Sequence, residues 1–298
     1  MSKILIRGFL LIAVFFFPLQ SFAEEVFRFQ QLLTIYADDA EKSLLRPEGL
    51  DCTSASLIVA DTGNNRLLKF ALADGTPKGA SEIKVPELTQ PIRVQVNSKG
   101  EILVLDGKKR RIVRLNPAGQ FIGYLDPKGL PSGPDIVLRS FKLDRQDNIY
   151  ILDVFSGRVL ILNPEGEYQK EISFPEEYGF FSDLAVAPGG GIFLIDSVES
   201  RVFSAPEGSK SFSPITGRVK DIMSFPTGIT VDGKGLIYVV DQNGGSIVIF
   251  RQDGSFQGRR LAMGWREGLL YYPTQMCVNN DGDAFIADRN NNRIPVFR

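Results

Sequence analysis

A small set of charged and amide side chains has the chemistry to bind a ligand. These residues are Glu48, Arg93, Arg139, Asp183 and Gln275. Two neighbouring guanidinium groups can hold a small anion, because arginine binds carboxylate and phosphate through paired hydrogen bonds. With two acids beside them, the same groups could instead neutralise one another in a closed network. The residue types favour the network and leave the anion site open as an alternative.

Chemistry that depends on histidine is excluded, because the 298 residues contain none. Neither a Ser-His-Asp triad nor a histidine zinc site can be built. A calcium site needs oxygen ligands, which Glu48, Asp183 and Gln275 would supply in part. The guanidinium groups of Arg93 and Arg139 would repel the cation. We therefore predict no cofactor and no metal, with calcium as the weaker alternative.

One short polar turn, residues 279–283, resembles part of a calcium-binding loop. An EF-hand loop would need a Glu later in the segment, and position 290 is Asn290 instead. The turn is also placed where every other copy of the repeat described below has an ordinary hairpin. We therefore interpret it as a turn.

Aromatic and basic residues are a second group of candidates, in segments that do not repeat. They are Trp265, Arg266, Tyr271 and Tyr178. Trp, Tyr and Arg are the residues most enriched at binding hot spots. They predict a docking surface for a protein or glycan, with plain packing between structural units as the alternative.

A pattern of roughly 45 residues, repeated six times, positions all these candidates. Each copy has a short apolar strand, a polar turn and a second apolar strand that ends in aspartate. The aspartates are Asp61, Asp106, Asp153, Asp196, Asp241 and Asp288, at separations of 45, 47, 43, 45 and 47 residues. Short strands rich in Val, Ile, Leu and Phe and punctuated by Gly, Asn and Asp are typical of β-meanders.

An arginine follows five of these aspartates at a spacing of five residues. The arginines are Arg66, Arg111, Arg158, Arg201 and Arg293, and Ser246 takes the sixth place. An aspartate that ends a strand can accept backbone N–H bonds in the turn, and the arginine can pair with it or pack on a neighbouring unit. A pair that recurs in nearly every copy is interpreted as part of the fold rather than as a functional site.

The repeated unit resembles the NHL repeat, whose pattern is P-x-G-I-x-V-D followed by G-x-I-Y-V-x-D-x-x-N-x-R-I-x-V-F. The stretch PTGITVDGKGLIYVVDQNG at 226–244 is the clearest copy. The resemblance covers essentially all of residues 24–298. It implies an all-β protein, a six-bladed β-propeller of four-stranded antiparallel blades. Such propellers resemble rigid discs with variable faces, and propellers of similar appearance include streptogramin-type and peptide-amidating lyases and lactonases.

The propeller is expected to form one domain whose blades lie near 44–86, 90–126, 137–175, 180–215, 225–262 and 272–298. The last unit ends after its third strand. We expect segment 26–36 to supply the missing fourth strand, because this closure hides an exposed sheet edge.

Alignment of the six units places two rings of residues at the mouth of the central channel. The first ring is Glu48, Ile92, Arg139, Ser182, Thr227 and Thr274. The second ring is Gly49, Arg93, Ser140, Asp183, Gly228 and Gln275.

The two cysteines fall on the first strands of units one and six, which closure makes neighbours. Cys52 and Cys277 lie five and four residues after Pro47 and Pro273. Their opposite parity lets the side chains face each other or both point away. In an oxidising compartment, a disulfide between them would hold the ring closed. The favoured interpretation is nevertheless that the two cysteines are separate, buried thiols.

The first 23 residues predict a signal peptide. Lys3 and Arg7 precede the apolar run 9–17, and Ser21-Phe22-Ala23 forms a cleavage site. We therefore expect an exported protein, periplasmic or extracellular, with no transmembrane segment after cleavage. Removing Lys3 and Arg7 leaves 32 basic and 35 acidic residues, a net charge of −3, which gives no reason to bind nucleic acid.

These observations predict a non-catalytic exported binding or scaffold propeller, which recognises a protein or glycan partner in the cell envelope through its loop face and channel mouth. The alternative is a calcium-dependent lactonase-like or lyase-like enzyme.

Overall fold

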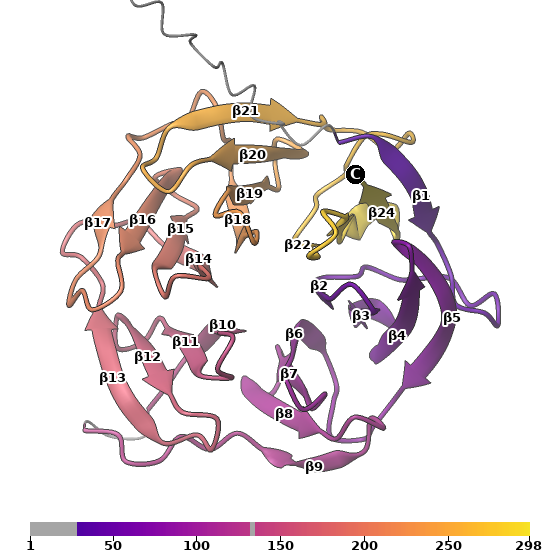
Figure 1. The fold of residues 1–298 in the computed structure, drawn as a ribbon, viewed down its shortest axis with the longest axis horizontal. Helices are drawn as coiled ribbons and strands as arrows, with labels where there is room; N and C mark the ends of the chain where they lie inside the picture. Colours follow the sequence, from indigo (N-terminus) through magenta and orange to yellow (C-terminus); the bar gives the residue numbers. More distant parts are fainter. Residues whose placement is uncertain (1–28, 132–134) are drawn as a thin grey trace, which may run out of the picture.

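The computed structural model describes residues 29–131 and 135–298, and in these ranges six four-stranded antiparallel sheets form a ring (Figure 1). The expected propeller is therefore confirmed. The expected signal peptide, 1–23, lies outside the described residues. No helix in the described part of the chain has the length and apolar character needed to cross a membrane.

Each blade is a meander whose strands run in order from the channel to the rim. Blade 1 comprises β2 (Gly49–Cys52), β3 (Ser56–Asp61), β4 (Arg66–Ala73) and β5 (Thr76–Ile83). Blade 2 comprises β6 (Pro91–Val96), β7 (Ile102–Asp106), β8 (Arg111–Leu115) and β9 (Phe121–Tyr124). Blade 3 comprises β10 (Leu138–Leu143), β11 (Ile149–Asp153), β12 (Arg158–Leu162) and β13 (Tyr168–Ser173).

The second half of the ring has the same arrangement. Blade 4 comprises β14 (Phe181–Val186), β15 (Ile192–Asp196), β16 (Arg201–Ala205) and the short β17 (Ser213–Pro214). Blade 5 comprises β18 (Pro226–Val231), β19 (Ile237–Asp241), β20 (Ser246–Phe250) and β21 (Phe256–Arg260). Blade 6 comprises β22 (Met276–Val278), β23 (Ala284–Ile286), β24 (Ile294–Phe297) and, from the other end of the chain, β1 (Gln31–Ile35).

Closure of the ring occurs in blade 6, as the sequence predicts. Strand β1 pairs antiparallel with β24, with Ile35 opposite Ile294. The two ends of the propeller chain thus lie in one sheet (Figure 1). A disulfide between Cys52 and Cys277, with Cα atoms 6.0 Å apart, joins blades 1 and 6 a second time. The favoured expectation of two separate thiols is therefore replaced by the disulfide, because the two side chains face each other.

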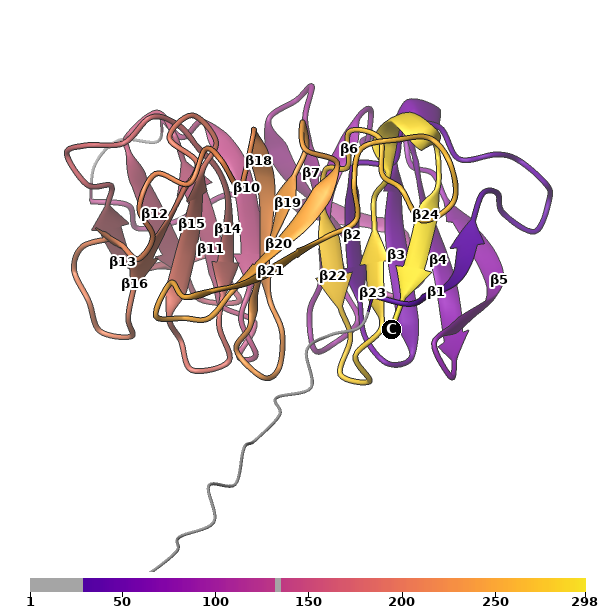
Figure 2. The ribbon, with the colours of Figure 1, turned by 90° about the horizontal axis from the view of Figure 1, so that it is seen from above.

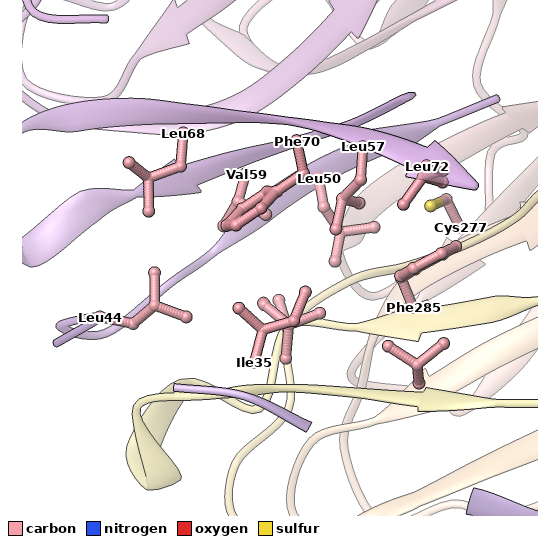
Figure 3. Packing of buried hydrophobic residues seen from close by; sticks show 13 residues of the cluster. Ile35, Leu44, Leu50, Leu57, Val59, Leu68, Phe70, Leu72, Cys277 and Phe285 are labelled. Carbon is pink, nitrogen blue, oxygen red and sulfur yellow. The ribbon is translucent and has the colours of Figure 1, made fainter. Parts of the chain in front are cut away.

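The core consists of apolar layers between neighbouring blades. Figure 3 shows the layer between blades 1 and 6, where Ile35 and Phe285 face Leu57 and Phe70. The middle strands carry Val, Ile, Leu and Phe on both sides, because each sheet is covered by a blade on either side. Each fully buried side chain of this kind contributes about 1.5–3 kcal/mol.

The repeated aspartates join two kinds of loop at one face of the disc. Asp196, which is fully buried, accepts hydrogen bonds from the backbone N–H groups of Val198 and Glu199 in its own turn. It also accepts them from Gly179 and Phe180 in the connection from the preceding blade. We call the face that carries these turns and connections the upper face, which is uppermost in Figure 2, and the opposite one the lower face.

The aspartate–arginine pairs form in three of the five expected units. The Nε atoms of Arg66, Arg158 and Arg293 lie 2.7, 3.1 and 2.7 Å from Asp61, Asp153 and Asp288. The expected pairs Asp106–Arg111 and Asp196–Arg201 do not form. Arg111 lies instead over the ring of Tyr124, and Arg201 over the ring of Phe203, while backbone N–H groups satisfy the two aspartates.

Candidate functional site at the channel mouth

A cavity of about 220 Å³ opens at the upper mouth of the channel. It is lined by Glu48, Ile92, Arg93, Arg139, Phe225, Thr227, Gln242, Thr274 and Arg289. Five of these residues belong to the first ring that the sequence predicts. We call this cavity the arginine pocket.

β-Bulges at the start of the innermost strands direct the first-ring side chains into this mouth. In β10, Leu138 pairs with Asp153 and Ser140 with Leu152, so Arg139 is the extra, unpaired residue. The pairings in blades 2, 4 and 5 skip Ile92, Ser182 and Thr227 in the same way. A bulge re-aims the side chain of its extra residue.

The polar groups of the pocket include several without partners. Arg93 Nε, Arg139 Nε and Thr227 Oγ1 are buried and have no hydrogen-bond partner in the described part of the chain. Arg93 is only 6% exposed and Thr227 only 7%. Arg93 Nη1 donates to the Ile92 carbonyl at 2.9 Å, which fixes one side of its guanidinium group.

Arg139 is a cation of the pocket whose positive charge is not balanced by a paired carboxylate of any described residue. Its guanidinium carbon lies 5.5 Å from the centre of the Phe180 ring, and no carboxylate of the described chain pairs with it. Burial and the neighbouring charge of Arg93 lower the pKa of Arg139, and the charges of Asp183 and Glu48 offset this only in part. An anion placed here would relieve both effects.

A third arginine, Arg289, completes the pocket, and the sequence analysis did not include it. It lies in the short 3₁₀ turn Arg289–Asn291 of blade 6, and its Nε is 3.2 Å from Glu48 Oε1. The only signal in the sequence was an additional arginine inside the Asp288–Arg293 turn. Since Glu48 is paired with Arg289, Arg93 and Arg139 are left without a counter-ion among the described pocket residues.

Two predicted site residues, Asp183 and Gln275, do not enter the pocket. Asp183 is fully buried and accepts hydrogen bonds from Ser140 Oγ at 2.5 Å and from the Ile229 N–H at 3.1 Å. Gln275 Oε1 accepts the Leu50 N–H at 2.9 Å. Both side chains therefore join innermost strands of neighbouring blades.

The same kind of bond occurs at two further junctions. Asp51 accepts the Val96 N–H at 2.8 Å, and Gln95 Oε1 accepts the Leu143 N–H at 3.3 Å. Burial raises the pKa of Asp51, although nearby Lys142 opposes the shift. The interior of the channel is thus held together by polar bonds between blades, whereas the mouth contains Arg93 Nε, Arg139 Nε and Thr227 Oγ1, which have no partner in the described part of the chain.

The predicted aromatic and basic residues lie in connections on the upper face. Trp265 is 75% exposed, and Arg266 beside it is exposed as well. Tyr271 contacts Tyr272, with ring centres 5.0 Å apart. Tyr178 stacks on buried Phe181 at 4.9 Å, so this ring packs between loops while keeping one side exposed.

Exposed apolar side chains gather in the upper-face turns and connections of blades 3–5, and we call this group the apolar arc. It consists of Phe155, Tyr178, Phe180, Val198 and Phe225. The sequence analysis missed Phe155, Val198 and Phe225, because apolar residues inside strand-rich repeats usually pack in the core and nothing in their types marks them as exposed.

No cluster of three or more His, Cys, Asp or Glu side chains suited to a metal ion occurs among residues 29–131 and 135–298. In the turn 279–283, Asn279 Oδ1 accepts the Asp281 and Asp283 N–H groups. The Asp283 carboxylate is paired with Arg298, whose Nε lies 2.7 Å away. These oxygens are therefore engaged within the turn and by an arginine.

Comparison with known proteins agrees with this architecture. The family model of the NHL repeat matches residues 270–297, which form most of blade 6. No curated protein matches the chain significantly. The six blades closed by the N-terminal strand form a β-propeller, and the match in blade 6 supports a propeller of the NHL-repeat type.

Several solved structures share the fold at low sequence identity. Virginiamycin B lyase from Staphylococcus aureus is 15% identical with a TM-score of 0.59, over 88% of this chain and 82% of the lyase. A putative gluconolactonase is 16% identical with a TM-score of 0.64, over 89% and 90%. Regucalcin from Agrobacterium tumefaciens, described as a calcium-binding protein, is 12% identical with a TM-score of 0.64, over 90% and 93%. These likenesses concern the fold alone.

Proposed function

We propose that this protein is a non-catalytic binding propeller that recognises a protein or glycan partner through its upper face and channel mouth. The observation that carries the proposal is that three residues lining the arginine pocket have buried polar atoms without hydrogen-bond partners in the described part of the chain. Each buried donor without a partner costs about 1–3 kcal/mol. A bound partner that accepts these hydrogen bonds would recover that cost.

Export to the periplasm or the extracellular space is part of the same proposal. The signal-peptide pattern of the first 23 residues supports it. The disulfide between Cys52 and Cys277 also supports it, because disulfides persist mainly in oxidising compartments.

The enzymatic alternative, a calcium-dependent lactonase-like or lyase-like propeller, finds support only in the fold of its neighbours. Calcium takes six to eight oxygen ligands. The upper mouth presents three guanidinium groups, and its one carboxylate, Glu48, is already paired with Arg289. Both the charge and the number of donors are therefore unsuited to a divalent cation.

The metal content of the natively purified mature protein tests this alternative. We expect less than stoichiometric calcium by elemental mass spectrometry, and the same content in the Glu48→Gln variant. One tightly held calcium per chain in the wild type, absent from Glu48→Gln, would revive the enzymatic alternative.

Partner capture tests the binding proposal itself. Trp265→Ser changes the most exposed aromatic residue of the upper face, and we expect it to reduce recovery of a specific partner from the native envelope fraction several-fold, since exposed Trp residues are frequent hot spots. The control is Ile122→Ser, which changes an exposed apolar residue on the rim strand β9. Equal capture by both variants and the wild type would contradict the use of the upper face.

A further inference from the structure

We propose that the arginine pocket receives the carboxylate of a Glu or Asp side chain of a partner protein, whose flanking apolar residues pack on the apolar arc. The inference rests on the proposed binding function and specifies the chemistry of its partner.

The charge of the pocket determines the sign of the group that enters. Arg93 and Arg139 have buried Nε–H donors without partners, and Thr227 adds a free hydroxyl. Planar guanidinium groups match the two oxygens of a carboxylate. A carboxylate would accept hydrogen bonds from these donors and would act as a counter-ion to Arg93 and Arg139. Glu48 does not fill this role, because it is paired with Arg289 at 3.2 Å.

The size of the pocket limits what can enter. At about 220 Å³ it is smaller than the ~300–1,000 Å³ of sites that enclose a whole small molecule. It accommodates one small anionic group, and the remainder of the ligand must lie on the surrounding surface. Phe225 lines the pocket and belongs to the apolar arc, so the two features are continuous.

The apolar arc is one surface, because neighbouring loops contact each other along it. A Cβ on Gly179, between Tyr178 and Phe180, would lie 2.6 Å from Val198 Cβ. Ser197, next to Val198, donates from its hydroxyl to the Pro226 carbonyl beside Phe225 at 2.6 Å. A Cβ on Gly157, in the turn that carries Phe155, would lie 3.9 Å from the Tyr178 hydroxyl.

The chemistry of the arc favours a protein segment over a glycan. Four of its five residues are Phe or Val, which cannot hydrogen-bond through their side chains. Sugar hydroxyls covered by this surface would lose water without gaining partners, which is costly. Leucine, valine or phenylalanine side chains of a protein would bury apolar area there at no such cost.

The position of the pocket favours an internal acidic residue over a chain terminus. Exposed apolar residues also lie in the connections that precede blades 6 and 1 on the upper face, namely Trp265, Tyr271 and Leu45. A segment that crosses the mouth with its acidic residue in the middle contacts both sides.

The test uses the mature chain and two arrays of N-acetylated, C-amidated dodecapeptides. One array has Glu or Asp at the centre, with flanks drawn from Leu, Val, Phe, Ser and Gly, and the other has Gln at the centre with the same flanks. We expect binders only in the acidic array. Arg139→Gln should weaken them by about ten- to a hundredfold, the worth of a charged hydrogen bond.

Three further variants control the result. Arg145→Gln removes an exposed arginine from the β10–β11 turn of the lower face and should leave the affinity unchanged. Phe155→Ser changes an arc residue that is 67% exposed, and it should weaken binding several-fold without affecting folding. Ile122→Ser on the rim should have no effect.

Equal binding to the acidic and Gln arrays, or an Arg139→Gln affinity equal to that of the wild type, would overturn the inference. Binding only to peptides with a free C-terminal carboxylate, or only to acidic glycans in a parallel panel, would overturn it as well. If Phe155→Ser weakens binding but Arg139→Gln does not, only the inference fails. If Trp265→Ser, Phe155→Ser and Arg139→Gln all bind peptides and capture partners like the wild type, the proposed function fails too.

Discussion

Replacement of Arg66 by methionine is expected to lower the free energy of unfolding by about 3–5 kcal/mol, the usual cost of removing one partner from a buried ion pair. Arg66 is fully buried between blade 1 and the connection that follows β1. Its Nε lies 2.7 Å from Asp61 Oδ2, and its Nη1 pairs with Asp38 and, at 2.8 Å, with Glu82.

The physical reason is the charge that the substitution leaves behind. Although burial disfavours the charged form, hydrogen bonds with Asp61, Glu82 and Asp38 raise the pKa of Arg66 above its ordinary value. In Arg66→Met, Asp61 stays buried with its negative charge opposed only by the Leu45 N–H and the Asn64 amide. A buried carboxylate that loses its cation must either keep an uncompensated charge or take up a proton.

Arg201→Met is the matched control, because Arg201 occupies the equivalent position in blade 4 and has no ion pair with any described residue. Its guanidinium carbon lies 5.2 Å from the centre of the Phe203 ring, and its Nε is buried without a partner. We expect a cost of at most about 1 kcal/mol. Urea unfolding followed by circular dichroism measures both variants. Equal losses in the two would show that the ion pairs of Arg66 add nothing beyond packing.

This contrast also shows how far the sequence predicts the structure. The spacing of the six aspartates predicts the number of blades, and in the structure each fully buried carboxylate accepts a backbone N–H group from the connection that precedes its own blade. The absent fourth strand of the last unit predicts closure by the N-terminal segment. A repeat of Asp and Arg does not determine which pairs form, since Tyr124 and Phe203 offer Arg111 and Arg201 an alternative contact.

The site was predicted only in part for a similar reason. Alignment of the units places the right residues at the mouth, but alternation along a strand does not reveal the bulges at Ile92, Arg139, Ser182 and Thr227. A bulge shifts the side-chain direction by one residue. Asp183, which follows the bulge residue Ser182, is consequently turned toward the neighbouring strand. Arg139, which is itself a bulge residue, enters the pocket.

The disulfide between Cys52 and Cys277 is expected to contribute about 2–4 kcal/mol to the stability of the ring. It joins residues 225 positions apart, and a cross-link over so long a segment removes much of the freedom of the unfolded chain. We expect the double variant Cys52→Ala/Cys277→Ala to unfold about 5–10 °C below the wild type, given the slope for domains of this size.

Thermal unfolding with and without reductant separates this effect from the loss of two side chains. The reductant should lower the midpoint of the wild type and leave the midpoint of the double variant unchanged. Two titratable thiols in the unreduced, unfolded wild type would contradict the pairing.

The β1–β24 pairing closes the ring independently of the disulfide. Loss of the disulfide should therefore leave the fold intact, and its effect should appear first where blades 1 and 6 meet. In the double variant, the backbone amide hydrogens of β1 and β24 should exchange with solvent faster than those of β11 and β12. The reason is that the junction of blades 1 and 6 then depends on strand pairing and on the apolar layer around Ile35 and Phe285 alone.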